Sequence, residues 1–241
     1  MNSPKKLRTT AAASLGAAAL AWALAGCGSD SGASSEDAGR PADRSPEEAA
    51  ARLHEAQLSG FQGLERVEEE SRTGVYSRLD VVREAAEKRE ALSLDKPECA
   101  DAASQWQELP EVQEAPASVA LFRGADGSLT HTLLELPEDL AAQAIDTVPV
   151  EECATYEATL EDGSSHSYTV RELDLETIGD QSRGIVVATE SANGEAVLLY
   201  SLLYREGGRL GSVSMIGAPE TEQRIADFAA AALEYQNEVL G

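Results

Sequence analysis

Alternating hydrophobic and polar positions are clearest in the C-terminal third of the chain. There, short segments rich in Val, Leu, Thr and Tyr are separated by turns that contain Gly, Asn or Ser, a pattern typical of antiparallel strands. The pattern predicts strands over residues 153–160, 165–173, 183–190, 195–205 and 209–216.

Two hairpins are indicated by their turn residues. Residues 117–123 and 128–135 have the strand pattern and are joined by Gly124-Ala125-Asp126-Gly127. Asn193-Gly194 is the second signal, because Asn and Gly accept the positive φ that a tight hairpin turn needs. These segments extend the predicted sheet toward the middle of the chain.

Apolar residues spaced three to four apart predict helices elsewhere. Ser45-Pro46-Glu47-Glu48 combines a capping serine, a proline and two acids, the order in which a helix begins. Residues 61–67 remain open between a short strand and a continuation of that first helix. The predicted helices cover residues 45–58, 78–94, 98–107, 137–144 and 219–239.

The order of these elements predicts an α+β fold. Its N-terminal part is helical, strands follow, and a long helix closes the chain. Such an order favours an antiparallel sheet with helices packed on one side. Residues 45–241 are expected to form a single extracytoplasmic domain, because their number suits one domain and no second linker interrupts them.

The N-terminus has the layout of an export signal. Three cations lie within the first eight residues, residues 9–25 are uncharged and mostly apolar, and Gly26-Cys27 follows. Leu24-Ala25-Gly26-Cys27 also resembles the lipobox of bacterial lipoproteins, which implies cleavage after residue 26 and a diacylglycerol on the Cys27 thiol. A non-lipidated signal and a spanning anchor are the alternatives, although the apolar run is shorter than the roughly 20 residues of a spanning helix.

A lipid on Cys27 anchors the mature chain to the cell membrane, facing the outside of the cell. Two acyl chains hold firmly, because each buried CH₂ contributes on the order of 0.8 kcal/mol. Residues 28–44 contain no large apolar side chain and cannot bury enough surface to fold. Residues 27–44 are therefore expected to be a flexible tether with a reach of roughly 20–25 Å.

Two cysteines remain after lipidation of Cys27. Cys99 and Cys153 allow one pairing, and exported proteins commonly oxidise such pairs. A disulfide closing a loop of about 55 residues stabilises a fold by roughly 4 kcal/mol in the chain-entropy model. Metal ligation is the weaker interpretation, because neither cysteine has a neighbouring Cys or His at short spacing.

Charge and motifs narrow the function classes. The formal net charge is −24, and removing the three cations of residues 1–26 gives −27. Such a chain repels nucleic acid. His54, His131 and His166 lack the spacing of a metal pair, and no nucleophile elbow, phosphate loop or metalloprotease helix is present in the sequence. No catalytic residue, metal or cofactor is predicted.

Other polar segments have a structural and a functional interpretation. Glu68-Glu69-Glu70 and Glu151-Glu152 are paired carboxylates that could act as acid and base or bind calcium weakly, and a solvated face is the favoured interpretation. Ile178-Gly179-Asp180 either shapes a binding rim or forms a turn in which Asp180 bonds its own backbone, and the turn is favoured. If a groove lies between sheet and helices, its apolar lining is expected to include Trp106, Phe122, Tyr156, Tyr168, Tyr200, Leu202, Tyr204 and Met215.

The overall layout resembles a group of actinobacterial cell-envelope lipoproteins and the related extracellular sensor domain of a mycobacterial Ser/Thr kinase. The shared features are a helical start, Cys99 after a Pro-containing stop, Cys153 opening a strand, the Ile178-Gly179-Asp180 turn, and a closing Ala-rich helix after Gly207-Gly208. The resemblance implies an antiparallel sheet flanked by helices with a groove, and ligand sensing rather than catalysis.

Three function hypotheses follow. The leading one is a tethered, non-catalytic domain that binds or senses a small ligand or an envelope protein. The alternative is a carrier of lipid or another apolar molecule, which requires a deep apolar cavity. The third is a hydrolase assembled from scattered residues, which requires a nucleophile and a base within hydrogen-bond reach.

Overall fold

The structure is a computed structural model that describes residues 44–100, 102, 104–125, 127–147, 151–160, 163–191, 194 and 196–241. The predicted export signal of residues 1–26, the lipidation site Cys27 and the tether up to residue 43 lie outside the described residues. Asn193 of the predicted hairpin turn lies outside them too.

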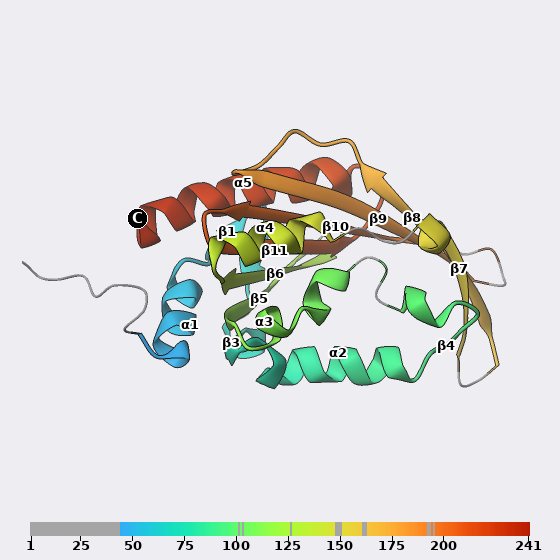
Figure 1. Cartoon of the computed structure of the whole chain (residues 1–241). Helices are drawn as coiled ribbons and strands as arrows, with labels where there is room; N and C mark the ends of the chain where they lie inside the picture. The colour runs from blue at the N-terminus through green and yellow to red at the C-terminus, as the bar shows by residue number, and fades with distance from the viewer. Residues whose placement is uncertain are drawn as a thin grey trace, which may run out of the picture. The chain divides into compact units, whose positions relative to one another are not determined.

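The described residues contain an antiparallel sheet of eleven strands (Figure 1). Its order is β1-β2-β5-β6-β11-β10-β9-β8-β7-β4, and β3 pairs with β5 next to the end that pairs with β2. The strands are β1 (Gly60–Phe61), β2 (Leu64–Arg66), β3 (Arg72–Val75), β4 (Ser93–Leu94), β5 (Pro116–Gly124), β6 (Gly127–Glu135), β7 (Thr155–Thr159), β8 (Ser165–Leu173), β9 (Gln181–Ser191), β10 (Ala196–Glu206) and β11 (Arg209–Ile216).

Helices and short 3-10 turns occupy the connections. The α-helices are α1 (Pro46–Glu55), α2 (Asp80–Glu90), α3 (Pro110–Gln113), α4 (Glu138–Asp146) and α5 (Thr221–Leu240). The 3-10 turns are η2 (Glu68–Glu70), η3 (Tyr76–Arg78), η4 (Pro97–Cys99), η5 (Gln105–Glu108) and η6 (Glu151–Ala154). The predicted α+β class, with its antiparallel sheet and long C-terminal helix, is confirmed.

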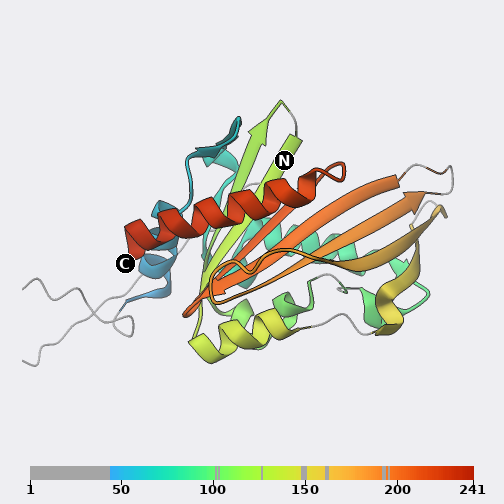
Figure 2. The ribbon, with the colours of Figure 1, turned by 90° about the horizontal axis from the view of Figure 1, so that it is seen from above.

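Helices cover both faces of the sheet, so their predicted placement on one side is wrong. Successive strand residues point to opposite faces. In β10, Leu202 belongs to the apolar cluster beneath α5, whereas Leu203 belongs to the cluster that includes α4 residues. In Figure 2, α5 (red) lies across the strands on the side of the sheet that faces the viewer. The central strands carry apolar residues on both faces, and both must therefore be covered.

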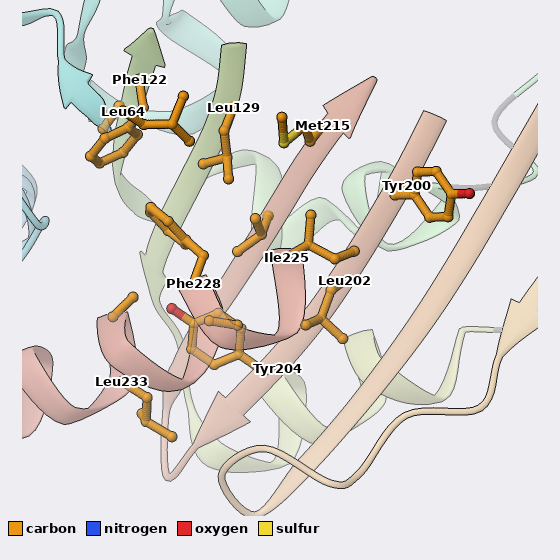
Figure 3. Close-up of a cluster of buried hydrophobic side chains, with 14 of the residues drawn as sticks. Leu64, Phe122, Leu129, Tyr200, Leu202, Tyr204, Met215, Ile225, Phe228 and Leu233 are labelled. Atoms are coloured by element: carbon orange, nitrogen blue, oxygen red, sulfur yellow. The ribbon is translucent and has the colours of Figure 1, made fainter. Parts of the chain in front are cut away.

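The core beneath α5 is built around Phe228. Its ring lies edge-on to Phe122, with 5.0 Å between ring centroids, and edge-on to Phe61 at 5.3 Å. Ile225 and Leu202 complete the contact between helix and sheet (Figure 3). Burying a side chain of this size contributes about 1.5–3 kcal/mol, and this packing therefore fixes the position of α5 on the sheet.

The first helix begins as its sequence predicts and ends earlier than expected. The Ser45 hydroxyl caps it by accepting a hydrogen bond from the Glu48 backbone N–H, and the Glu48 carboxylate accepts one from the Ser45 backbone N–H. The helix ends at Glu55 instead of residue 58. Gln57 is buried and donates its side-chain amide to the carbonyl oxygens of Ser118 and His131, and the chain leaves the helix just before this residue. The open segment 61–67 forms parts of two short strands.

Two other predicted helices are shorter or absent. The helix predicted over residues 78–94 covers Asp80–Glu90, and Ser93–Leu94 pairs with β7 instead. The helix predicted over 98–107 is replaced by η4 and η5. Cys99 and Trp106 are both buried but belong to different apolar clusters. The two residues are spaced like one face of a helix, but each is buried at a different packing site. The sequence pattern cannot distinguish these two cases.

The structure contains the predicted Cys99–Cys153 disulfide. The two Cα atoms are 5.4 Å apart, and the sulfurs are buried beside Ala102, Tyr156 and Val170. Cys153 lies in η6, directly before β7. The strand predicted to begin at Cys153 therefore begins at Thr155 instead. The disulfide fastens the segment after α2 to the β7–β8 end of the sheet.

Candidate binding groove beside the C-terminal helix

An open groove of about 720 Å³ lies between α5 and the segment that links β8 to β9. This volume is within the range of about 300–1,000 Å³ that is usual for ligand pockets. One wall is formed by residues 174–179 and the other by α5. The lining residues are Asp174, Leu175, Glu176, Thr177, Ile178, Gly179, Gln223, Ala226, Asp227, Ala230, Leu233, Glu234 and Asn237.

The wall segment alternates between inward and outward side chains. Leu173 and Leu175 pack toward the core, whereas Asp174 and Glu176 are exposed. Gly184 of β9 leaves room for these leucines, since a Cβ there would lie 2.9 Å from the Leu175 side chain. This two-residue alternation is that of an extended chain. In the described structure the segment pairs with a strand only at its last residue, Gly179, which forms a single bridge to Arg205 of β10.

Ile178-Gly179-Asp180 fixes the far end of the wall. Gly179 has a φ of +67°, and a Cβ at this position would lie 2.2 Å from the carbonyl oxygen of Arg205. The Asp180 carboxylate accepts a bond from the Gly207 backbone N–H at 2.8 Å and from the Arg205 guanidinium at 3.3 Å. The favoured turn, in which Asp180 bonds its own backbone, is therefore corrected: Asp180 ties the wall to the β10–β11 turn.

The apolar groove lining expected from the sequence is wrong. Phe122, Tyr200, Leu202, Tyr204 and Met215 are buried in the core beneath α5 (Figure 3). Trp106 packs in the cluster on the opposite face, and Tyr156 stacks on Tyr168 across β7 and β8. The groove residues were missed because Ala226 and Ala230 look like ordinary helix positions, and only the fold brings them opposite residues 174–179.

A second hollow, of about 470 Å³, lies near the start of the described chain. Three arginines and three glutamates line it: Arg44, Arg52, Arg209, Glu135, Glu138 and Glu206. Its opposite charges partly pair with each other, with 3.0 Å between Arg209 and Glu206 and 3.9 Å between Arg44 and Glu135. It therefore presents no net charge of one sign to a ligand.

A buried polar network joins α1, the sheet and α5. Gln57 points its amide nitrogen at carbonyl oxygens, so its side-chain oxygen must accept the bond from His131 Nδ1. His131 Nε2 is then an acceptor, and it accepts a hydrogen bond from the Tyr204 hydroxyl at 2.7 Å. The Tyr204 oxygen accepts from Gln236 at 2.8 Å. Burial lowers the pKa of His131 to about 3 and raises the pKa of Tyr204, and both side chains are neutral at pH 7.

A serine, a histidine and a glutamate also form a row of side-chain contacts, in the order of a hydrolase catalytic triad. Ser118 Oγ is 3.4 Å from His54 Nδ1, and His54 Nε2 is 3.1 Å from a Glu68 carboxylate oxygen. Ser118 has no exposed surface, and its Oγ also accepts from the Gln57 amide. A substrate carbonyl cannot reach this hydroxyl, so the arrangement gives the hydrolase hypothesis no working nucleophile.

The remaining candidates from the sequence do not come together. His54, His131 and His166 lie on α1, β6 and β8, and the described residues contain no group of three His, Cys, Asp or Glu placed to hold a metal. The Glu68–Glu70 run forms surface ion pairs: Glu68 bonds Arg66, and Glu70 bonds Arg123. None of the described helices is long and apolar enough to span a bilayer.

Comparisons with known proteins were made by sequence and by structure. No protein-family model and no curated protein matches the chain. Its structure resembles the extracellular domain of PknH from Mycobacterium tuberculosis, with a TM-score of 0.49 and 12% identity over 79% of this chain and 90% of that one. It also resembles an uncharacterized protein of Mycobacterium smegmatis, the Rv0999 ortholog, with a TM-score of 0.45 and 15% identity over 80% and 97%. The predicted resemblance to a mycobacterial kinase extracellular domain is found, and it concerns the fold alone.

Proposed function

We propose that this chain is a membrane-tethered extracytoplasmic domain that binds a ligand without converting it, and that the groove beside α5 is its binding site. The observation that carries the proposal is the groove itself, an open hollow of about 720 Å³ with an apolar floor and a wall held in place by Asp180. The export signal, lipobox and Cys99–Cys153 disulfide support a location outside the cytoplasm.

The floor of the groove supplies apolar contact at a fixed position. Leu175, Ile178 and Leu233 line it and also pack against the main core. Because these side chains are held by the fold, a ligand meets a surface that is already formed. A ligand bound there contacts both α5 and the β8–β9 connection. A sensor can pass on this binding event, because the bound ligand changes the surface that these two elements present to a partner.

The carrier of apolar molecules is the second candidate. A carrier must shield its cargo from water, and this requires an enclosed apolar cavity. The groove beside α5 is open and has four acidic side chains along its walls. This geometry favours a binding domain over a carrier.

A substitution that fills the groove tests the proposed function. Ala230 is exposed on the groove side of α5, so Ala230→Trp places a large ring in the groove without displacing the core. Ala85→Trp is a matched control, because Ala85 is an exposed alanine of α2 away from the groove. Thermal unfolding of the full-length chain in uncharged detergent is measured with a panel of basic, acidic and neutral peptides, fatty acids and long-chain amines.

The proposal predicts that at least one ligand class raises the unfolding temperature of the wild type and of Ala85→Trp but not of Ala230→Trp. The proposal is rejected if every ligand that stabilises the wild type stabilises Ala230→Trp equally, or if no ligand stabilises the wild type.

A further inference from the structure

The walls of the groove carry charge of a single sign. Asp174 and Glu176 lie on the β8–β9 connection, Asp227 and Glu234 lie on α5, and no basic residue lines the groove. None of the four carboxylates forms an ion pair with another residue in the part of the chain that the structure describes; Asp227 accepts only the Gln223 amide, at 2.8 Å. Unpaired acids on both sides of a hollow with an apolar floor attract a cation.

The wall also offers unpaired backbone groups. The backbone N–H groups of Leu175, Glu176 and Thr177 bond no other described residue, whereas that of Ile178 bonds the Ser182 hydroxyl at 2.9 Å. An extended segment with free peptide groups can pair with a second extended chain, as an open sheet edge does. A small amine or a fatty ammonium ion cannot pair with a row of such groups.

The opposite wall gives such a chain room and length. Ala226 and Ala230 are small, so the groove stays open along α5. Gln223 and Asn237, at its two ends, are 14 residues apart, which corresponds to about 21 Å of helix. An extended peptide of about six residues has this length.

We infer that the groove binds an extended peptide segment in which basic and apolar side chains alternate. Its backbone pairs with those N–H groups of residues 175–177 that lie on the groove edge of the segment. Its apolar side chains lie on Leu175, Ile178 and Leu233, and its basic side chains reach the acidic rims. The inference rests on the proposed function and adds the chemical class of the partner.

Fluorescence anisotropy of labelled hexapeptides tests the inference on the full-length chain in uncharged detergent. The probes are Lys-Val-Lys-Val-Lys-Val, its Glu-Val counterpart, and a Lys-Val peptide that is N-methylated along its backbone. In the groove variant, four acids are neutralised together: Asp174→Asn, Glu176→Gln, Asp227→Asn and Glu234→Gln. A matched control removes the same charge from exposed positions elsewhere: Glu84→Gln, Glu87→Gln, Glu90→Gln and Glu111→Gln.

We expect the Lys-Val peptide to bind the wild type and the control variant alike. The groove variant is expected to bind it roughly ten- to thirtyfold more weakly, because the three lysines lose exposed charge pairs of modest strength that act together. Added salt is expected to weaken wild-type binding. N-methylation is expected to weaken it at least tenfold, through the lost backbone bonds.

Three results overturn the inference. They are equal binding of the Glu-Val peptide, an equal loss in the control variant, and no effect of N-methylation. If the Lys-Val peptide does not bind, but another ligand stabilises the wild type and not Ala230→Trp, the inference fails and the proposed function stands. If no ligand distinguishes Ala230→Trp from Ala85→Trp, both fail.

Discussion

The buried histidine makes the stability of the fold depend on pH. His131 has no exposed surface, and burial lowers its pKa to about 3 from an unperturbed value near 6.5. Below pH 6.5 the unfolded chain takes up a proton at this side chain, whereas the folded chain does not until about pH 3. The contribution of neutral His131 to stability is therefore fully present above pH 6.5 and is lost progressively as the pH falls from 6.5 to 3.

The size of this effect follows from the two pKa values. One pKa unit corresponds to about 1.4 kcal/mol, so lowering the pH from 7 to 4.5 removes roughly 2.5 kcal/mol through His131 alone. Carboxylate groups add their own pH dependence, which is common to the wild type and to variants at position 131. His131→Leu removes the titrating group, and it also leaves Gln57 and Tyr204 without their partner, which lowers stability at pH 7 by about 1–3 kcal/mol.

Urea unfolding, followed by tryptophan fluorescence at pH 7 and pH 4.5, measures both effects. The difference in unfolding free energy between the two pH values is expected to be roughly 2.5 kcal/mol smaller in His131→Leu than in the wild type. His166→Leu is the control, because His166 lies on β8 outside the network, and it is expected to keep the part attributed to His131. An equal pH dependence in the wild type and His131→Leu refutes the reasoning.

Three further variants test other parts of the structure. Replacing Cys99 and Cys153 by alanine is expected to lower the unfolding free energy by about 4 kcal/mol, measured by urea titration; a loss below about 1 kcal/mol contradicts the stabilising role of the disulfide. Gly179→Ala places a Cβ against the Arg205 carbonyl at a positive φ and is expected to cost about 1–3 kcal/mol, whereas thermal unfolding identical to the wild type shows that the wall is not held there. Cys27→Ala is expected to release the chain from membranes in cell fractionation, and retention in the membrane fraction argues against lipid anchoring.

Local signals in the sequence predicted the strands well. The two strands predicted on either side of Gly124–Gly127 are β5 and β6, whose ends differ by about one residue from the prediction. The strands predicted over residues 165–173 and 209–216 have the predicted ends. Ser45 and Glu48 likewise predicted the start of α1. Such features depend on a few neighbouring residues and on the two-residue period of a strand, so one sequence suffices to find them.

Features that depend on distant contacts were missed. Strand β3 is a four-residue segment that contains Gly74, and its only sheet partner in the described residues is β5. The placement of α4 on the opposite face from α5 depends on which strand residues each helix meets. The groove is of the same kind, because residues 174–179 and α5 are about 50 residues apart and have no sequence signal in common. The Ile178-Gly179-Asp180 motif marked its position, although the role of Asp180 became clear only from its bond to Gly207.

The central claim is that the groove beside α5 is where this protein binds its partner. Hydrogen exchange of the full-length chain, with and without saturating Lys-Val peptide, tests it residue by residue. Successive N–H groups of an extended segment point to opposite edges. The account therefore predicts slower exchange either at Glu176 or at both Leu175 and Thr177, whose backbone amides have no partner in the described structure. Unchanged exchange at these three amides, with protection only near Arg44 or elsewhere, contradicts it.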